Sequence, residues 1–132
     1  MRNTRIIVSA LATFCVAALT ATSLFDVQAA DKKAAYSMEE IMKTGMKGDT
    51  STLKKVLDGV ATDAEKKQLV EYCKALTQLE PAKGDAASWK AKTAALLAAA
   101  EKVAAGDKAA IAALKETSNC KACHSVHKGE KK

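Results

Sequence analysis

Apolar residues recur every three or four positions along most of the chain after residue 36, and no stretch alternates strictly between apolar and polar residues. This pattern predicts helices and no strands. Ser37 and Glu40 are placed as the two ends of a capping box that opens the first helix. Gly45 weakens that helix, and Gly48 ends or kinks it. Its apolar residues are Met38, Ile41, Met42 and Met46.

A second, short helical run follows, and Gly59 makes its end uncertain. Its apolar face consists of Leu53, Val56, Leu57 and Val60. Thr62 and Glu65 form another capping box, and Pro81 and Gly84 close the helix that this box opens. The apolar stripe of that helix is Leu69, Tyr72, Cys73, Leu76 and Leu79.

Asp85 is predicted to cap a long helix that Gly106 terminates, and Asp107 to cap the next helix. The apolar positions of the long helix are Trp89, Leu96, Ala100 and Val103. We expect the last helix to run without a break from about Lys108 to His124. Short connections favour antiparallel neighbours. The predicted fold is therefore an all-α antiparallel four-helix bundle with a fragmented first helix.

Residues 1–30 have the three regions of a secretory signal peptide. Arg2 and Arg5 give a positive start, residues 6–19 are almost wholly apolar, and Ala29 is a small residue suited to cleavage. We expect cleavage after Ala29 or Ala30, with an uncleaved membrane anchor as the alternative. Phe14 precedes Cys15, which argues against lipidation there. The mature domain would then be residues 31–132, exported to the periplasm or beyond, with no stable membrane insertion.

The net charge is +6, and it falls to about +5 when Arg2, Arg5 and Asp26 leave with the signal. The lysines are spread along the chain among acidic neighbours, without a basic block interleaved with aromatic residues, so no nucleic-acid partner is expected. A mild positive field suits docking to acidic protein surfaces or anionic lipid, but we favour the simpler interpretation, an ordinary solvated lysine-rich surface.

The segment Cys120-Lys121-Ala122-Cys123-His124 matches C-x-x-C-H, the attachment motif of c-type haem. Two thiols one helical turn apart add to the two vinyl groups of one porphyrin, and the adjacent histidine ligates the iron. C-type haem is attached outside the cytoplasm, so the motif agrees with the predicted export. We expect one covalent haem c, held by Cys120 and Cys123, with His124 as proximal iron ligand.

Other interpretations of the motif remain open. Cys120, Cys123, His124 and His127 are potential zinc ligands, but they lie within eight consecutive residues with no second pair to complete a tetrahedral site. A thioredoxin-like redox pair would need strands, which the sequence does not predict. Although this clustering argues against a zinc site, a zinc-stapled structural module is kept as the last of three functional hypotheses, after the two haem-based ones given below.

A helical domain of this length with C-x-x-C-H on its final helix resembles the class II c-type cytochromes, the cytochrome c prime group. The resemblance covers essentially all of the mature chain. It implies a four-helix bundle with the haem attached on the C-terminal helix. In low-spin members a methionine of a Met-Lys pair on the first helix is the sixth iron ligand, and Met42-Lys43 matches that pair. Many members have an arginine where this chain has Met38, so the cation that meets the propionates is left open.

Met38, Met42 and Met46 are spaced four residues apart. Such a stripe is more often an adaptable core than a set of ligands, but a haem needs a distal partner, and Met/His pairs are known axial ligands. Met42 is our first candidate and Met46 the alternative. If neither binds iron, a five-coordinate haem would bind a small gas such as NO or CO.

The first functional hypothesis is thus an electron carrier with a His/Met-ligated haem and transient redox partner proteins. We find no nucleophile–base pair or carboxylate dyad, so we do not expect an enzyme. A homodimer formed through helix faces is possible. Three other residues carry expectations: Cys73 as a buried core residue with an intermolecular disulfide as the alternative, Trp89 as a core residue, and His127 as a solvated histidine near the C-terminus.

Overall fold

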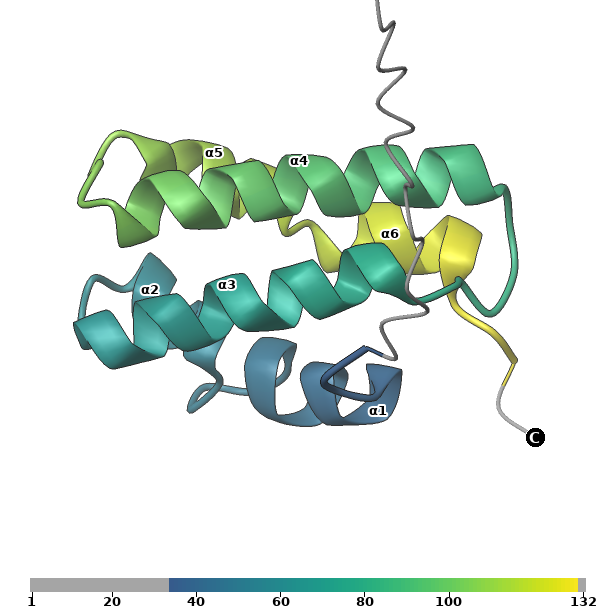
Figure 1. The fold of residues 1–132 in the computed structure, drawn as a ribbon, viewed down its shortest axis with the longest axis horizontal. Coiled ribbons are helices and arrows are strands. Elements are labelled where there is room, and N and C mark those ends of the chain that lie inside the picture. Colours follow the sequence, from purple (N-terminus) through teal and green to yellow (C-terminus); the bar gives the residue numbers. More distant parts are fainter. Residues whose placement is uncertain (1–33, 131–132) are drawn as a thin grey trace, which may run out of the picture.

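A computed structural model describes residues 34–130, which contain helices and no strand (Figure 1). The predicted all-α class is therefore confirmed for this part of the chain. The predicted signal peptide, its cleavage site and Cys15 lie outside the described residues. Within residues 34–130, no helix is both long enough and apolar enough to span a membrane.

The elements of the described part follow one another along the chain with short connections. They are α1 (Met38–Glu40), η1 (Ile41–Met46), α2 (Thr52–Leu57), α3 (Asp63–Gln78), α4 (Ala86–Ala104), α5 (Ala110–Thr117) and α6 (Cys120–His127). Helices α3 and α4 lie side by side and run in opposite directions (Figure 1). Helix α5 returns along α4, and η1 packs against α2 and α3.

The predicted starts of the first helix, of α3 and of α4 are confirmed by their hydrogen bonds, although only one half of the capping box predicted at Ser37 is present. The Ser37 hydroxyl oxygen accepts from the backbone N–H of Glu40 at 3.2 Å. At the start of α3 the capping box is complete, because Thr62 Oγ1 accepts from the N–H of Glu65 at 3.2 Å and the Glu65 carboxylate accepts from the N–H of Thr62 at 2.8 Å. Asp85 caps α4 by accepting from the N–H of Ser88 at 2.7 Å.

The first helix differs from the prediction in its hydrogen bonding. Only α1 is α-helical, and η1 is a π-helix in which, for example, the N–H of Lys47 donates to the carbonyl of Met42 at 2.9 Å. Gly48, with a φ of 94°, ends the segment as expected. Single π turns are rare in helices and occur often at functional sites.

The prediction of one unbroken C-terminal helix is wrong. The chain leaves the helix at Ser118, and Asn119 has an extended backbone with φ −63° and ψ 101°. The Asn119 side chain accepts from the N–H of Ala122 at 3.1 Å and so caps a new helix, α6. Short polar side chains compete with helical hydrogen bonding in this way. The predicted Asp107 cap is also wrong, because α5 begins later, at Ala110, with Ala109 as its uncapped first boundary residue. Asp107 instead accepts from the N–H of Ala109 at 2.9 Å, before the helix starts.

The core lies between α3, α4, α2 and α5, with η1 closing one side. Its most deeply buried side chains are Ile41, Leu69, Leu114, Val56 and Cys73. Tyr72 joins η1 to this core, because its hydroxyl oxygen accepts from Thr44 Oγ1 at 3.1 Å. Its ring also packs edge-on against Tyr36, which precedes α1, with centroids 4.9 Å apart. These contacts set the position of η1 relative to α3.

Candidate functional site

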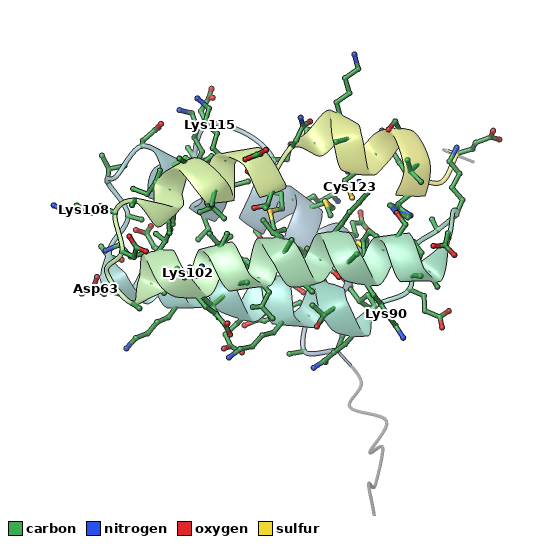
Figure 2. All side chains as sticks on the ribbon, turned by 90° about the horizontal axis from the view of Figure 1, so that it is seen from above. Asp63, Lys90, Lys102, Lys108, Lys115 and Cys123 are labelled. Atoms are coloured by element: carbon green, nitrogen blue, oxygen red, sulfur yellow. The ribbon has the colours of Figure 1, made fainter. Side chains whose placement is uncertain are left out.

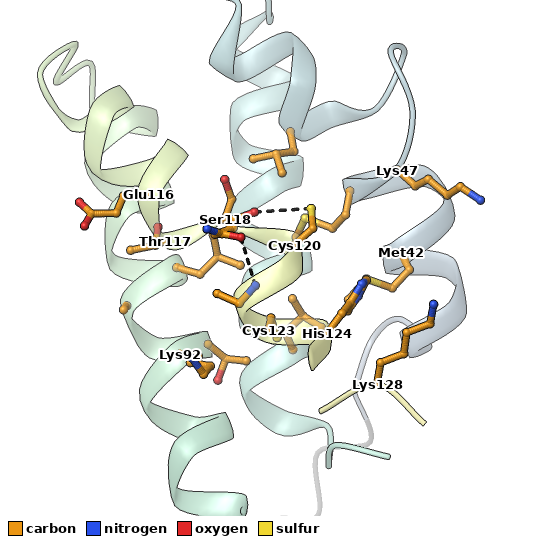
Figure 3. A pocket seen from close by; sticks show the side chains of 18 of the residues that line it. Met42, Lys47, Lys92, Glu116, Thr117, Ser118, Cys120, Cys123, His124 and Lys128 are labelled. Carbon is orange, nitrogen blue, oxygen red and sulfur yellow. Dashed lines mark hydrogen bonds between the residues drawn. The ribbon is translucent and has the colours of Figure 1, made fainter. Parts of the chain in front are cut away.

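A cavity of about 710 Å³ lies between η1 and α6 (Figure 3). Its size falls within the roughly 300–1,000 Å³ typical of pockets that hold small molecules and cofactors. Its walls come from segments at the two ends of the described chain. The lining includes Met42 and Met46 from η1 and Cys120, Cys123 and His124 from α6. Leu53, Leu76, Trp89 and Leu96 add apolar surface.

The α6 wall carries the whole C-x-x-C-H constellation. Cys120 and Cys123 both line the cavity, and His124 lies beside them (Figure 3). Cys120 is exposed and Cys123 is half-buried, on the side of α6 that faces α4 (Figure 2). Burial raises the pKa of the Cys123 thiol, and the positive charge of Lys92 opposes that shift. Because Cys120 and Cys123 line the same cavity, both thiols are accessible from it, as covalent attachment to a single ligand requires.

The opposite wall carries two of the three methionines in the stripe. Met42 and Met46 line the cavity and are half-buried, whereas Met38 packs against the core and is not part of the lining. Met42 extends into the cavity from the side opposite His124 (Figure 3). The structure thus brings both candidate distal ligands to the cavity, and iron binding by either methionine stays a prediction.

Trp89 forms part of the cavity wall and of the core at once. Its indole N–H donates to the carbonyl of Leu79 at 2.7 Å, and its side chain is buried. Thr93, the next turn along α4, donates from its hydroxyl to the carbonyl of Trp89 at 3.0 Å. Because these polar atoms are paired within the protein, this wall presents mainly apolar surface to the cavity. The expectation that Trp89 is a core residue is confirmed.

The rim of the cavity is predominantly basic. Lys47, Lys92 and Lys128 line it, with Glu116 as the acidic residue in the lining (Figure 3). An anionic group entering the cavity would therefore meet cations from three different segments of the chain.

The expectation of a solvated His127 is wrong. Its side chain is only 3% exposed. One ring nitrogen, Nδ1, lies 3.2 Å from the Lys83 carbonyl, the other, Nε2, lies 3.3 Å from Ser88 Oγ, and the ring packs edge-on against Trp89. The end of α6 packs on the loop before α4, a tertiary contact that position near the C-terminus does not reveal.

The arrangement does not assemble the zinc site considered from the sequence. In residues 34–130, no three histidine, cysteine, aspartate or glutamate side chains are grouped so that they could hold a metal ion together. His127 would have to give up its hydrogen bond to Lys83 or to Ser88 to become a ligand. The four potential zinc ligands of the motif region therefore point to at least two different environments.

Cys73 is completely buried, which confirms the expectation of a core residue. Burial raises the pKa of its thiol to about 12, with the negative charge of Glu101 as a smaller cause. A disulfide to a second chain would require Cys73 to leave the core. The alternative of a Cys73-linked dimer is therefore inconsistent with this fold.

Comparisons of this chain with protein-family models, with curated proteins and with solved structures found no match. The functional proposal therefore rests on the cavity and the residues that line it.

Proposed function

We propose that this chain is an exported mono-haem c-type cytochrome of the class II kind that carries electrons. One observation supports the proposal most strongly: the cavity brings Cys120, Cys123 and His124 together on one wall and Met42 and Met46 on the other. The two methionines come from a segment far from the motif in the sequence. A chance C-x-x-C-H sequence would have no reason to face such a pair across an apolar space.

The residues of α6 would attach and orient the cofactor. Cys120 and Cys123 provide the two thioether sulfurs, and His124 provides the proximal imidazole nitrogen. A covalently bound haem supplies a one-electron redox centre. The protein holds that centre in an apolar cavity, which limits water access, and leaves part of the α6 side exposed for electron exchange.

On the distal side we propose Met42 as sixth ligand, with Met46 as the alternative. A thioether ligand opposite a histidine favours the reduced state and raises the reduction potential. Because both side chains belong to the protein, neither ligand needs to be exchanged when an electron arrives or leaves. This property suits an electron carrier rather than an enzyme.

We also propose that the chain has the antiparallel four-helix bundle of the class II c-type cytochromes, with the haem attached on the C-terminal run of that bundle. Its four runs would be the segment from α1 to α2, then α3, then α4, and finally α5 with α6. Both the first and the last run are interrupted. The interruption at Ser118–Asn119 lets α6 follow its own direction past the end of α5.

The charge distribution supports an acidic redox partner. In the described part of the chain, every ion pair lies between residues 39 and 74. The lysines of α4 and the following residues, such as Lys90, Lys102, Lys108 and Lys115, point outward without a partner in those pairs (Figure 2). Lys47, Lys92 and Lys128 at the rim are candidates for meeting the haem propionates.

A second candidate function uses the same cavity. The η1 residues that line it are both methionines, which offer thioethers and no hydrogen-bond donor. If both stay off the iron, the site is a five-coordinate haem with an apolar distal wall, suited to NO or CO. This alternative differs from the carrier only in distal ligation.

The test is the visible absorption of the purified, reduced mature protein with and without carbon monoxide, together with its mass. A covalent haem and a low-spin spectrum unchanged by the gas are expected. A high-spin spectrum that shifts with the gas would favour the second candidate. Cys73→Ala is the matched control for Cys120→Ala and Cys123→Ala, since it changes a cysteine outside the cavity and should keep both thioether bonds. A full-length mature mass without an added tetrapyrrole would refute both candidates.

A further inference from the structure

The helix that carries the motif has one buried side chain, and it is His127. Cys120 and His124 are exposed, and Cys123 is half-buried. At its N-terminal end α6 begins directly after the non-helical residues Ser118 and Asn119. The side-chain contacts that fix the other end of α6 are therefore largely those of His127.

Three groups contact the ring of His127, and we call these three interactions together the His127 contact. Nδ1 lies 3.2 Å from the carbonyl oxygen of Lys83, and because a carbonyl only accepts, Nδ1 must carry the proton and donate. In the neutral ring, Nε2 then accepts from the hydroxyl of Ser88, 3.3 Å away. The edge-on ring of Trp89, with centroids 5.4 Å apart, completes the contact.

Gly84 makes room for this contact. A β-carbon on Gly84 would lie 2.8 Å from His127 Nδ1 and 2.8 Å from the carbonyl oxygen of Val126. Gly84 also has a φ of 88°, which side chains other than glycine rarely adopt. The loop before α4 is thus shaped, in conformation and in size, to receive the end of α6.

We propose that His127 is a positioning residue that fixes the rotation and direction of α6, so that Cys120, Cys123 and His124 face the cavity. His124 and His127 lie one helical turn apart, so α6 cannot rotate about its axis without moving both. The same residues Ser88 and Trp89 belong to α4, which lines the cavity. The His127 contact therefore ties the motif to the wall it must face. This inference rests on the proposed function in one respect only, namely that His124 is the residue that binds the haem iron.

The test is amide hydrogen exchange, followed by mass spectrometry, of residues 120–128 in the full mature protein as purified. His127→Leu keeps an apolar body and removes both hydrogen bonds. Gly84→Ala displaces His127 without changing it. Both should raise exchange in α6 about tenfold while leaving α3 unchanged. His127→Asn, which can still donate to the Lys83 carbonyl, should show a smaller increase.

Gly106→Ala is the matched control. Gly106 also has a positive φ, 96°, but a β-carbon there would meet nothing within 4 Å. The Gly106→Ala substitution therefore carries the same conformational cost of an alanine at positive φ, without contacting α6. If neither His127→Leu nor Gly84→Ala raises α6 exchange above the Gly106→Ala level, the positioning role is wrong. Should His127→Leu fail to fold, Gly84→Ala and His127→Asn decide the question.

A spectroscopic measurement separates this inference from the proposed function. In a haem-containing protein, His127→Leu should shift the reduction potential and the ligand-sensitive absorption bands, and His127→Asn should partly restore them. If the purified protein carries no haem, the proposed function fails, yet the exchange result still tests the His127 contact. If haem is present and both exchange and spectrum are unchanged in His127→Leu, only the positioning role is overturned.

Discussion

The backbone of Gly45 lies directly against the ring of Tyr72, so that a β-carbon on Gly45 would be 2.8 Å from Tyr72 Cδ2. Gly45 is buried in η1, between the two methionines that line the cavity. Tyr72 lies on α3 and accepts a hydrogen bond from Thr44. This close approach sets how deeply η1 packs, and with it the distance of Met42 and Met46 from α6.

Gly45→Ala should therefore destabilise the protein. Alanine gains up to about 1 kcal/mol of helix propensity over glycine, but forcing a methyl group into the Tyr72 ring costs about 1–3 kcal/mol. We expect a net loss in the free energy of unfolding, measured by chemical denaturation. In a Tyr72→Leu background the loss should shrink or reverse, because the ring is gone. An equal loss in both backgrounds would show that the contact is not the cause.

Replacement of Met42 should reveal the distal ligand. If Met42 binds iron, Met42→Ala converts a low-spin spectrum to a high-spin one that responds to carbon monoxide. Met38→Ala is the matched control, because Met38 is on the same stripe but does not line the cavity. Conversion by Met46→Ala and not by Met42→Ala would transfer the assignment to Met46.

The buried Cys73 should make the protein less stable in alkali. Its thiol pKa is raised from 9.0 to about 12 in the folded state. The unfolded chain therefore loses this proton first, and the stabilising effect, complete below pH 9, is lost as the pH rises toward 12. One proton contributes about 1.4 kcal/mol per pH unit. In Cys73→Ala, the free energy of unfolding should fall less steeply between pH 9 and 11. Equal slopes would contradict the raised pKa.

Glu65 should make the protein sensitive to acid. The hydrogen bond from Lys55, the largest cause, and that from the N–H of Thr62 lower the pKa of the Glu65 carboxyl from 4.5 to about 2. The stabilising effect is present above pH 4.5 and is lost as the pH falls toward 2. Glu65→Gln should have a lower Tm at pH 7 and a flatter acid limb between pH 4.5 and 2. Glu71→Gln is the matched control, because Glu71 lies on the same helix and pairs with Lys74.

The starts of α3 and α4 could be predicted because each depends on partners three residues apart. Thr62 with Glu65, and Asp85 with Ser88, close their hydrogen bonds within the first turn of a helix. The break before α6 also had such a local signal: Thr117, Ser118 and Asn119 are three consecutive residues that favour caps over helix interiors. Apolar residues at helical spacing continue on both sides of these three residues, and for that reason the pattern predicted one unbroken helix.

The helical class, the capped starts of α3 and α4, and the motif at residues 120–124 follow from the sequence alone, because these features depend on neighbours within one or two turns. Three other features depend on how whole helices pack. They are the π hydrogen bonding of η1 beside Tyr72, the cavity that Met42 and Met46 line with α6 and Met38 does not, and the burial of His127. The ring of His127 meets groups 39 and 44 residues away in the chain. No spacing rule reaches that far, because packing of whole helices, and not local periodicity, brings such residues together.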